Sequence, residues 1–414
     1  MSKERILAVL ANAIDTSGDC LKQQVAFLDP PDGRVIYRIP EGLVEALEAE
    51  PKIAAASGQA FNQRNHFGSL HLTQIAEALI DSALEIGAEP AVNRLYQTFD
   101  RDYNACIEVA MLAGITVERR IELSDGVFLA PLRDVPSTTM QAYLAGMANA
   151  RPRPNFAPWA VLEMSFESKS QAALYRDIEV RPKYVSPGVL MRIPDTAHDR
   201  LLGSVANLLV LTLPSTAAIS RTFVELRDGE LLKDHVSRGA SWTDLGSTLV
   251  QSHPLTEEDA DDAANIIRLY LKLPEKERIA LDVPLHRLNE ATRTHSLIDR
   301  ALDLGIAFES LLLADNTDHN QLTMNFRLRG AWLLGNDSAR RSELFDLLGR
   351  LYQYRSAAAH AGQTKQIKRF NAEADLQQGL SLCAAAIREV ISRGGRPQWS
   401  SLLLGGRYEA AVRS

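Results

Sequence analysis

The stretch LYQYRSAAAHAG, residues 351–362, places an arginine and a histidine five positions apart among small and apolar residues. Arginine carries a permanent positive charge with several hydrogen-bond donors, and histidine titrates closest to neutral pH and can transfer protons. Arg355 and His360 could therefore form a catalytic site, or they could simply end a helix with an ion pair and a cap. On an ideal helix they lie about 140° apart, so they share no face. A two-fold axis could still bring two copies of each into one groove.

Arginine precedes histidine at similar spacing in two other segments, RNHFGSLH (Arg64 and His71) and RIPDTAH (Arg192 and His198). The first segment runs through a glycine and a serine that extend a helix poorly, and a proline breaks the second. Only the pair at residues 355 and 360 lies late in a strongly periodic helix. We therefore take that pair as the candidate site.

A helix is predicted for SLIDRALDLGIAFESLLLAD, because apolar residues recur in two rows along it. Glu309 falls inside the second row, one turn from both Ile306 and Leu313. A buried carboxylate needs a cation or several donors, since an unpaired one costs several kcal/mol. We expect an ion pair with an arginine of a neighbouring helix, which could be purely structural or could hold a catalytic arginine in place.

The helix that carries the candidate pair has a leucine stripe that Arg355 continues. The stripe consists of Leu344, Leu347, Leu348 and Leu351. Ser356 and three alanines follow, and their small side chains leave room for another backbone or a substrate. Gly362 is predicted to be the C′ residue that ends the helix.

Charge is unevenly distributed along the chain. The 414 residues carry a formal net charge of −7, so the protein lacks the basic excess that wraps DNA without specificity. From Arg355 to the C-terminus, however, there are nine Lys and Arg against four Asp and Glu. A nucleic-acid site must therefore be local, and three residues just after His360 could attract phosphate groups: Lys365, Lys368 and Arg369.

The remaining chemistry in the sequence is sparse. Three widely separated cysteines predict neither a disulfide framework nor a metal knuckle. No glycine-rich phosphate loop, HExxH or GxSxG motif is present, so we expect no metal and no cofactor. The charged N-terminus and the lack of a long apolar run predict a cytoplasmic protein without a membrane span.

The order of patterns predicts an α+β protein. Residues 1–250 form an N-terminal region, which is helical to about residue 113 and strand-rich over 114–250, with ITVERRIEL, VFLAPL, LLVLTL and SRTFVEL among the predicted strands. Residues 251–395 form an all-α bundle, which begins with Thr256 as an N-cap before an acidic first turn. Further helices are predicted at about 285–291, 296–314, 320–334, 341–361 and 370–393. Residues 396–414 form an irregular tail.

Three motifs in order resemble the HEPN superfamily, in particular its Apea-like branch. They are LNEATRTHSLIDRALDLGIAFESLLL, FRLRGAWLLG and LGRLYQYRSAAAHAG, and the similarity covers about residues 281–395, roughly a quarter of the chain. The resemblance implies a HEPN-type bundle of four to five helices and a homodimer that places two Arg-x4–6-His motifs in one cleft. Active members are metal-independent endoribonucleases, many of them toxins or antiviral effectors.

The resemblance also implies residue roles. Arg355 and His360 match the motif pair, Ser356 the polar position after the arginine, Glu309 the acidic residue of the second motif and Arg329 the arginine of the third. Ala359 departs from the family, which usually has a branched apolar residue there. RNA supplies its own nucleophile, the 2′-hydroxyl, and its attack gives a 2′,3′-cyclic phosphate. His360 would act as general acid or base, and Arg355 would stabilise the transition state.

Two hypotheses remain open. The first is a bacterial antiphage-defence or toxin ribonuclease whose N-terminal region regulates it, or senses a phage-derived or small-molecule trigger. The second is a non-catalytic HEPN dimer that binds RNA, a nucleotide or a protein partner through the same cleft.

Overall fold

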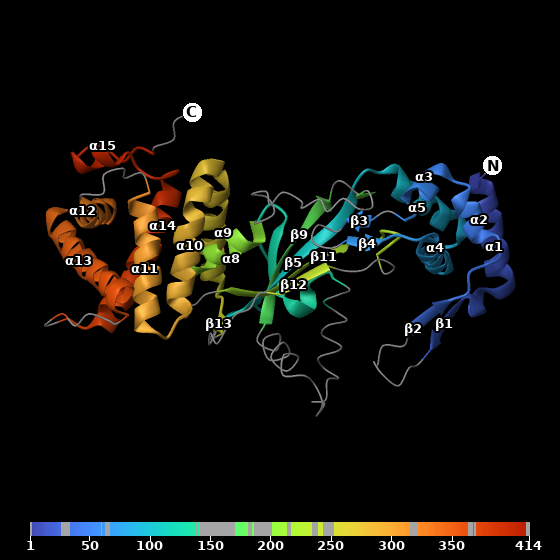
Figure 1. The fold of residues 1–414 in the computed structure, drawn as a ribbon, viewed down its shortest axis with the longest axis horizontal. Helices are drawn as coiled ribbons and strands as arrows, with labels where there is room; N and C mark the ends of the chain where they lie inside the picture. Colours follow the sequence, from blue (N-terminus) through green and yellow to red (C-terminus); the bar gives the residue numbers. More distant parts are fainter. Residues whose placement is uncertain are drawn as a thin grey trace, which may run out of the picture.

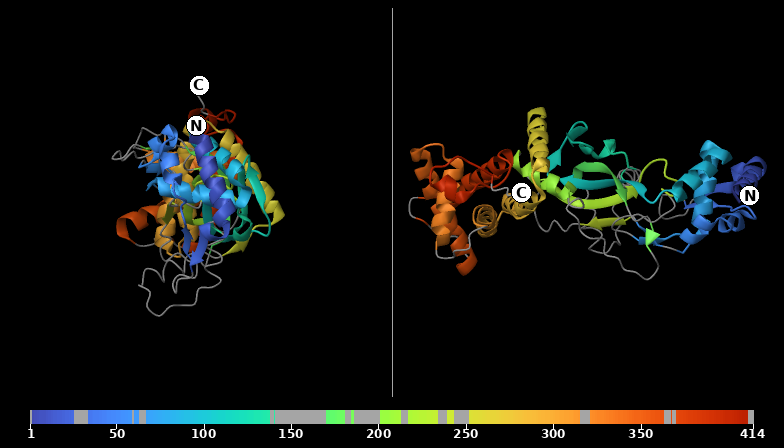
Figure 2. Two further views of the ribbon diagram at one scale, coloured as in Figure 1. Left: turned by 90° about the vertical axis from the view of Figure 1, so that its right-hand side faces the viewer. Right: turned by 90° about the horizontal axis from the view of Figure 1, so that it is seen from above.

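The computed structural model places an antiparallel sheet between two groups of helices, which lie at opposite ends of the long axis (Figure 1). The view from above in Figure 2 shows the same order, with the C-terminal bundle and the N-terminal helices separated by the sheet. The chain is therefore α+β, as predicted. The structure describes residues 2–25, 34–58, 60–62, 67–137, 140, 170–180, 184–185, 201–212, 217–233, 239–242, 252–314, 321–362, 367 and 370–410.

Five helices form the N-terminal end: α1 (Ser2–Leu21), α2 (Leu43–Glu48), α3 (Pro51–Ala56), α4 (Leu72–Ile86) and α5 (Ala88–Asp100). They bury one apolar cluster that includes Ile6, Leu10 and Leu79. Short strands accompany them: β1 (Lys22–Val25) pairs with β2 (Arg34–Tyr37), and β3 (Ala60–Asn62) lies between β4 (Phe67–Ser69) and β10 (Tyr184–Val185). Up to residue 100 the described residues are mainly helical, as predicted, apart from these strands.

The central sheet has six strands in the order β12-β11-β5-β9-β8-β7, all antiparallel to their neighbours. They are β5 (Asn104–Ala113), β7 (Ile121–Ser124), β8 (Val127–Pro131), β9 (Ser170–Val180), β11 (Ala218–Leu226) and β12 (Gly239–Trp242). A short parallel pair, β6 (Ile115–Thr116) and β13 (His253–Pro254), links the sheet to the start of the bundle. The 3₁₀ turn η1 (Leu132–Asp134) follows β8.

Two sequence predictions in this region were wrong. Residues 104–113 were assigned to the helical part, but they form the central strand β5, whose residues are nearly all buried. A strand buried on both faces shows no alternation of polar and apolar residues. Conversely, LLVLTL is predicted as a strand, but its described residues are the last residue of helix α8 (Leu201–Leu208), the 3₁₀ turn η3 (Leu209–Leu211) and Thr212. A short apolar run does not distinguish the two structures.

The C-terminal part is helical, as predicted. It contains α9 (Glu257–Lys272), α10 (Glu275–Arg293), α11 (Leu297–Leu312), α12 (Leu322–Leu334), α13 (Ser338–Ala361), α14 (Ala372–Ser392) and α15 (Trp399–Leu403). The side chain of Thr256 caps α9 by accepting a hydrogen bond from the Asp259 backbone N–H, which confirms the predicted N-cap. Helix α10 starts ten residues before the predicted 285, because it continues through Pro284.

The segment after α14 was predicted to be irregular, but part of it is ordered against the bundle. Trp399 and Leu402 of α15 are buried in the main apolar core. Arg396 is ion-paired with buried Glu277 of α10, with 3.1 Å between Nε and Oε2. This segment therefore packs on the bundle.

A single apolar core runs from the sheet into the bundle. It joins Leu112 and Leu174 on one face of the sheet, Val205 of α8, and Ile267 and Leu288 of the bundle. A boundary near residue 250 therefore separates two kinds of secondary structure and not two independent cores. Among the helices that the structure describes, none combines the length and apolar character needed to cross a bilayer.

The continuous core predicts that a fragment of residues 251–414 is less stable than the whole chain. Without α8 and the sheet, the apolar faces of α9 and α10 become exposed, and each leucine-sized side chain loses about 1.5–3 kcal/mol of burial. We expect the fragment to bind a hydrophobic dye and to unfold at a lower temperature than the bundle in the full chain. A fragment that binds no dye and unfolds at the same temperature would show that the bundle does not depend on the sheet.

Candidate functional site

Helix α13 packs its core row directly onto glycines of three neighbouring helices. A Cβ added at Gly330 of α12 would lie 2.5 Å from Leu348, and one at Gly379 of α14 would lie 3.0 Å from Leu351. At Gly305 of α11 it would lie only 2.2 Å from Cγ of Arg355. Each glycine thus leaves space for an α13 side chain, and at Gly379 that space is shared with Leu304 of α11. The aliphatic part of the Arg355 side chain packs against a glycine of a neighbouring helix, as Leu348 and Leu351 do.

The head of Arg355 forms an ion pair with Glu309. Nη2 of Arg355 lies 2.8 Å from Oε2 of Glu309, one turn after Gly305 on α11. The two side chains remain 28% and 25% exposed, respectively. The pair expected for Glu309 is therefore confirmed, and its partner is the candidate arginine itself. A guanidinium has five N–H donors, and the one on Nε is buried without a hydrogen bond in the described part of the chain.

Burial raises the pKa of the Glu309 carboxyl, and the charge and hydrogen bond of Arg355 oppose that rise. The net direction is upward. Because folding raises this pKa above the unfolded value of about 4.3, the folded state holds the proton more tightly. The contribution of Glu309 to stability is therefore greatest below that pH and falls as the pH rises through the folded pKa.

The residues after Arg355 lead to an exposed helix end. Ser356 is half-buried, Ala358 is buried, and Ala359 and His360 are exposed. Gly362 ends α13 with a φ of 59°, and its N–H donates to the carbonyl of Ala358 at 3.1 Å. This confirms the predicted helix end. Arg355 faces α11 while His360 is exposed in the last turn, so one chain does not bring the two side chains onto one face.

Arg329 lies elsewhere in the bundle. It is buried on α12, and its Nη1 donates to the carbonyl of Leu312 at 2.6 Å. Its guanidinium also lies 5.1 Å from the ring centre of Trp399. Arg329 thus satisfies the C-terminal end of α11, one turn beyond Glu309, and holds α15 against the bundle.

Several predicted residues lie outside the described residues. They are the phosphate-attracting candidates Lys365, Lys368 and Arg369, and also Arg64, Arg192 and His198 of the two weaker pairs. His71, the other member of those pairs, is the N-cap residue of α4 and forms a capping box with Gln74. That histidine therefore has a structural role.

A polar network beside Arg355 was not expected from the sequence. Arg350 binds Asp375 of α14 in a bidentate manner, at 2.8 and 3.0 Å, and the Tyr354 hydroxyl donates to the same carboxylate at 2.9 Å. Burial and the bond to Asp375 raise the pKa of Tyr354 to about 12. Arg350 also lies over the ring of Phe370, 4.0 Å from its centre. The spacing of Arg350 and Tyr354, four residues apart on one helix face, was the available signal.

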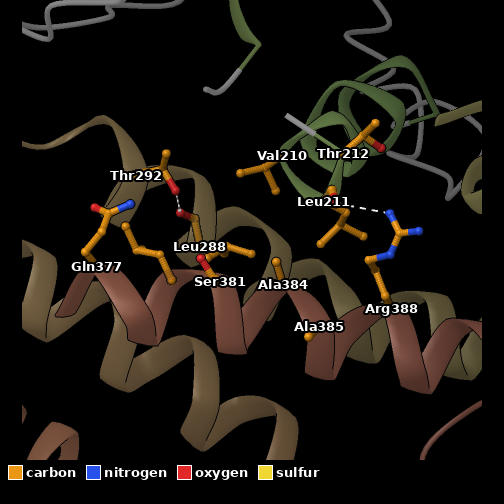
Figure 3. A pocket seen from close by; sticks show the side chains of 11 residues that line it. Val210, Leu211, Thr212, Leu288, Thr292, Gln377, Ser381, Ala384, Ala385 and Arg388 are labelled. Carbon is orange, nitrogen blue, oxygen red and sulfur yellow. Dashed lines mark hydrogen bonds between the residues drawn. The ribbon is translucent and has the colours of Figure 1, made fainter. Parts of the chain in front are cut away.

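An open cleft of about 320 Å³ lies between η3, α10 and α14 (Figure 3). Its α14 residues are on the side of that helix opposite Gly379, and therefore face away from α13. Arg388 is the one charged residue among the described residues that line it, and Asp262 already binds its guanidinium at 2.6 and 2.7 Å. Apart from this paired guanidinium, the described lining consists of hydroxyl, amide and apolar side chains and has no histidine or carboxylate. Within the described ranges, no three His, Cys, Asp or Glu side chains are placed to hold a metal ion.

The ion pair makes a testable prediction about pH. In Arg355→Ala, the burial of Glu309 is no longer opposed, so its pKa rises further and the free energy of unfolding at pH 7 falls by about 1–2 kcal/mol. The loss should shrink as the pH approaches 4, where the carboxyl is mostly protonated in both states. Urea unfolding at pH 4, 5.5 and 7 measures it.

The double variant Arg355→Ala/Glu309→Gln is the matched control for this effect. It carries no carboxylate at residue 309, so its loss of stability relative to wild type should not grow with pH as that of Arg355→Ala does. A pH-independent loss in Arg355→Ala itself would show that Glu309 is not the titrating partner.

Comparison with known proteins yielded no match to this chain, whether the search was made against protein-family models, curated proteins or solved structures. The functional argument therefore depends on the geometry of the site and on the three motifs.

Proposed function

We propose that this chain is a HEPN-type endoribonuclease that acts as a homodimer, with Arg355 and His360 as its catalytic residues. The main supporting observation is the way in which Arg355 is held. A glycine on α11 receives its stem and a half-buried carboxylate binds its head, yet the side chain stays 28% exposed. A surface arginine that only caps a helix needs neither the glycine nor the carboxylate.

The chemistry follows from RNA carrying its own nucleophile. The 2′-hydroxyl oxygen forms a bond to the adjacent phosphorus, and the bond from phosphorus to the 5′-oxygen breaks, which leaves a 2′,3′-cyclic phosphate and a 5′-hydroxyl. His360 accepts the proton of the 2′-hydroxyl or donates one to the leaving oxygen. Arg355 keeps three further N–H donors on its two Nη atoms beside the one that binds Glu309, and these can stabilise the charge that develops on the phosphate.

A second copy of the chain completes the proposed cleft. Arg355 and His360 lie about 140° apart around α13, so one chain presents them in different directions. A two-fold axis near the end of α13 would place the arginine of one protomer beside the histidine of the other. The small side chains at residues 356–359 allow close approach of another chain or of the substrate.

One observation favours a second candidate function, a non-catalytic HEPN dimer that binds RNA, a nucleotide or a protein. The Arg355–Glu309 pair is complete within one chain, so it also suits a role that is only structural. The exposed His360 in the same helix end favours the enzyme. From the resemblance alone, we also propose a role in bacterial antiphage defence or toxin-mediated growth arrest, with residues 1–250 regulating the bundle in response to a phage-derived or small-molecule trigger.

The ribonuclease proposal predicts RNA cleavage by the full-length chain in the presence of EDTA, with 2′,3′-cyclic phosphate ends. Arg355→Ala and His360→Ala should each lower the rate by at least 100-fold. Arg340→Ala and His295→Ala, at other exposed positions of the bundle, are matched controls that should leave it unchanged. Thermal unfolding of each variant checks that the fold is intact.

Full-length protein that folds, dimerises and binds RNA without cutting it would favour the binding module. Expression toxicity in bacteria, compared for wild type and the same variants, tests the proposed toxin role separately. Toxicity that persists in His360→Ala would contradict a role that depends on cleavage.

The packing of Arg355 against Gly305 predicts the effect of Gly305→Ala on activity. The added methyl group would lie 2.2 Å from Cγ of Arg355, so the arginine must move. A displacement of about 1 Å can cost 100-fold in rate, so we expect a large loss of kcat. Alanine favours the helix by about 1 kcal/mol relative to glycine, which offsets part of the packing strain.

Gly330→Ala is the matched control, because it displaces Leu348 by the same kind of clash. It should lower the unfolding temperature but preserve kcat when measured well below that temperature. Equal losses of kcat in the two variants would show that activity follows general packing and not the position of Arg355.

A further inference from the structure

Phe370 is a half-exposed aromatic residue close to the candidate site. It lies immediately before Asn371, the N-cap of α14, and is 49% exposed. Five large hydrophobic residues are at least 46% exposed in the described part of the chain, and Phe370 is the only aromatic among them. Such a ring leaves apolar surface in contact with water.

The ring is nevertheless held in place. The Arg350 guanidinium lies 4.0 Å from the ring centre, within the range of a cation–π contact. Arg350 in turn is fixed by two hydrogen bonds to Asp375 in the first turn of α14. The Phe370 N–H donates to the carbonyl of Ile367 at 3.1 Å. Phe370 is thus preorganised with a cation on one side of the ring, while half of its surface remains accessible.

The same network connects Phe370 to the candidate site. Tyr354, the neighbour of Arg355 in the chain, donates to the Asp375 carboxylate that binds Arg350. Arg350 precedes Arg355 by five residues, which is about 7.5 Å along the helix axis. Arg350 and Arg355 also lie about 140° apart around α13, so the ring and the candidate arginine are on different sides of the helix, and an RNA chain that contacts both must run around α13.

We propose that Phe370 is a base-stacking subsite, on which a nucleobase of the bound single-stranded RNA stacks. An aromatic ring backed by a guanidinium and left half-exposed is the kind of surface on which proteins stack unpaired bases. The proposal rests on the proposed ribonuclease function and names a determinant of its substrate: unpaired RNA, bound through the π-face of a base and not through a sequence-specific hydrogen bond.

The test uses the full-length chain and a fluorescent 2′-O-methyl RNA oligonucleotide, which lacks the nucleophile and cannot be cut. The dissociation constant is measured by fluorescence anisotropy for wild type, Phe370→Leu and Phe370→Trp. Loss of one stacked base corresponds to about 1–3 kcal/mol, so Phe370→Leu should weaken binding roughly 5- to 140-fold. Phe370→Trp should bind at least as tightly as wild type.

Two controls make the result specific. Leucine retains apolar contact without a π-face, so it separates stacking from a hydrophobic role. Met324→Ala removes another exposed apolar side chain of the bundle, 46% exposed on α12, and should leave binding unchanged. With cleavable RNA, Phe370→Leu should raise KM more than it lowers kcat, since the ring is proposed to bind a base and not the reacting phosphate.

Unchanged affinity in Phe370→Leu, or the absence of RNA binding by wild type, would overturn the subsite. A loss of dimer mass in Phe370→Leu, measured by light scattering, would also overturn it and would show that a second copy of the chain covers the ring. The two proposals fail separately: cleavage with unchanged affinity leaves the ribonuclease without this subsite, whereas Phe370-dependent binding without cleavage leaves the subsite without the ribonuclease.

Discussion

The candidate site depends on one packing constraint, the row of α13 side chains that rests on glycines of the surrounding helices. A helix without a Cβ at the crossing point lets a neighbouring side chain approach its backbone. In this bundle Leu348, Leu351 and Arg355 each occupy such a place, on α12, α14 and α11 respectively. The first two stabilise the bundle by burial. Arg355 packs on its glycine in the same way, which positions a cation where α13 leaves the packed interior.

The ion pair with Glu309 then fixes the guanidinium of Arg355, whose side chain is positioned by packing. Glu309 stands one turn beyond Gly305, so the residue that makes room for the arginine stem and the residue that binds its head belong to the same helix. On the other side of α13, Arg350 and Tyr354 bind Asp375 and so tie the start of α14 to the same helix. Helix α13 therefore ends at the Gly362 cap, and the first turn of α14 is held to α13 by this network.

Much of this could be predicted from the sequence where the signal is local. The amphipathic pattern predicted the helices of the bundle, and Thr256 and Gly362 marked helix ends correctly because capping depends on adjacent residues. The position of Glu309 in an apolar row predicted a buried ion pair. The sequence did not identify Arg355 as its partner, since that requires the crossing of α11 and α13. The bond between Arg350 and Asp375 was missed for the same reason, and β5 was missed because a fully buried strand has no alternation.

The central claim is that Arg355 and His360 act together across two copies of the chain. Mixing Arg355→Ala and His360→Ala proteins tests it most directly. In a mixed dimer, the His360→Ala protomer supplies an intact Arg355 and the Arg355→Ala protomer supplies an intact His360 to the same cleft. RNA cleavage by the mixture, when neither variant alone is active, is the result the account predicts. A mixture that forms mixed dimers, shown by two affinity tags, and remains inactive while wild type cuts RNA would contradict it.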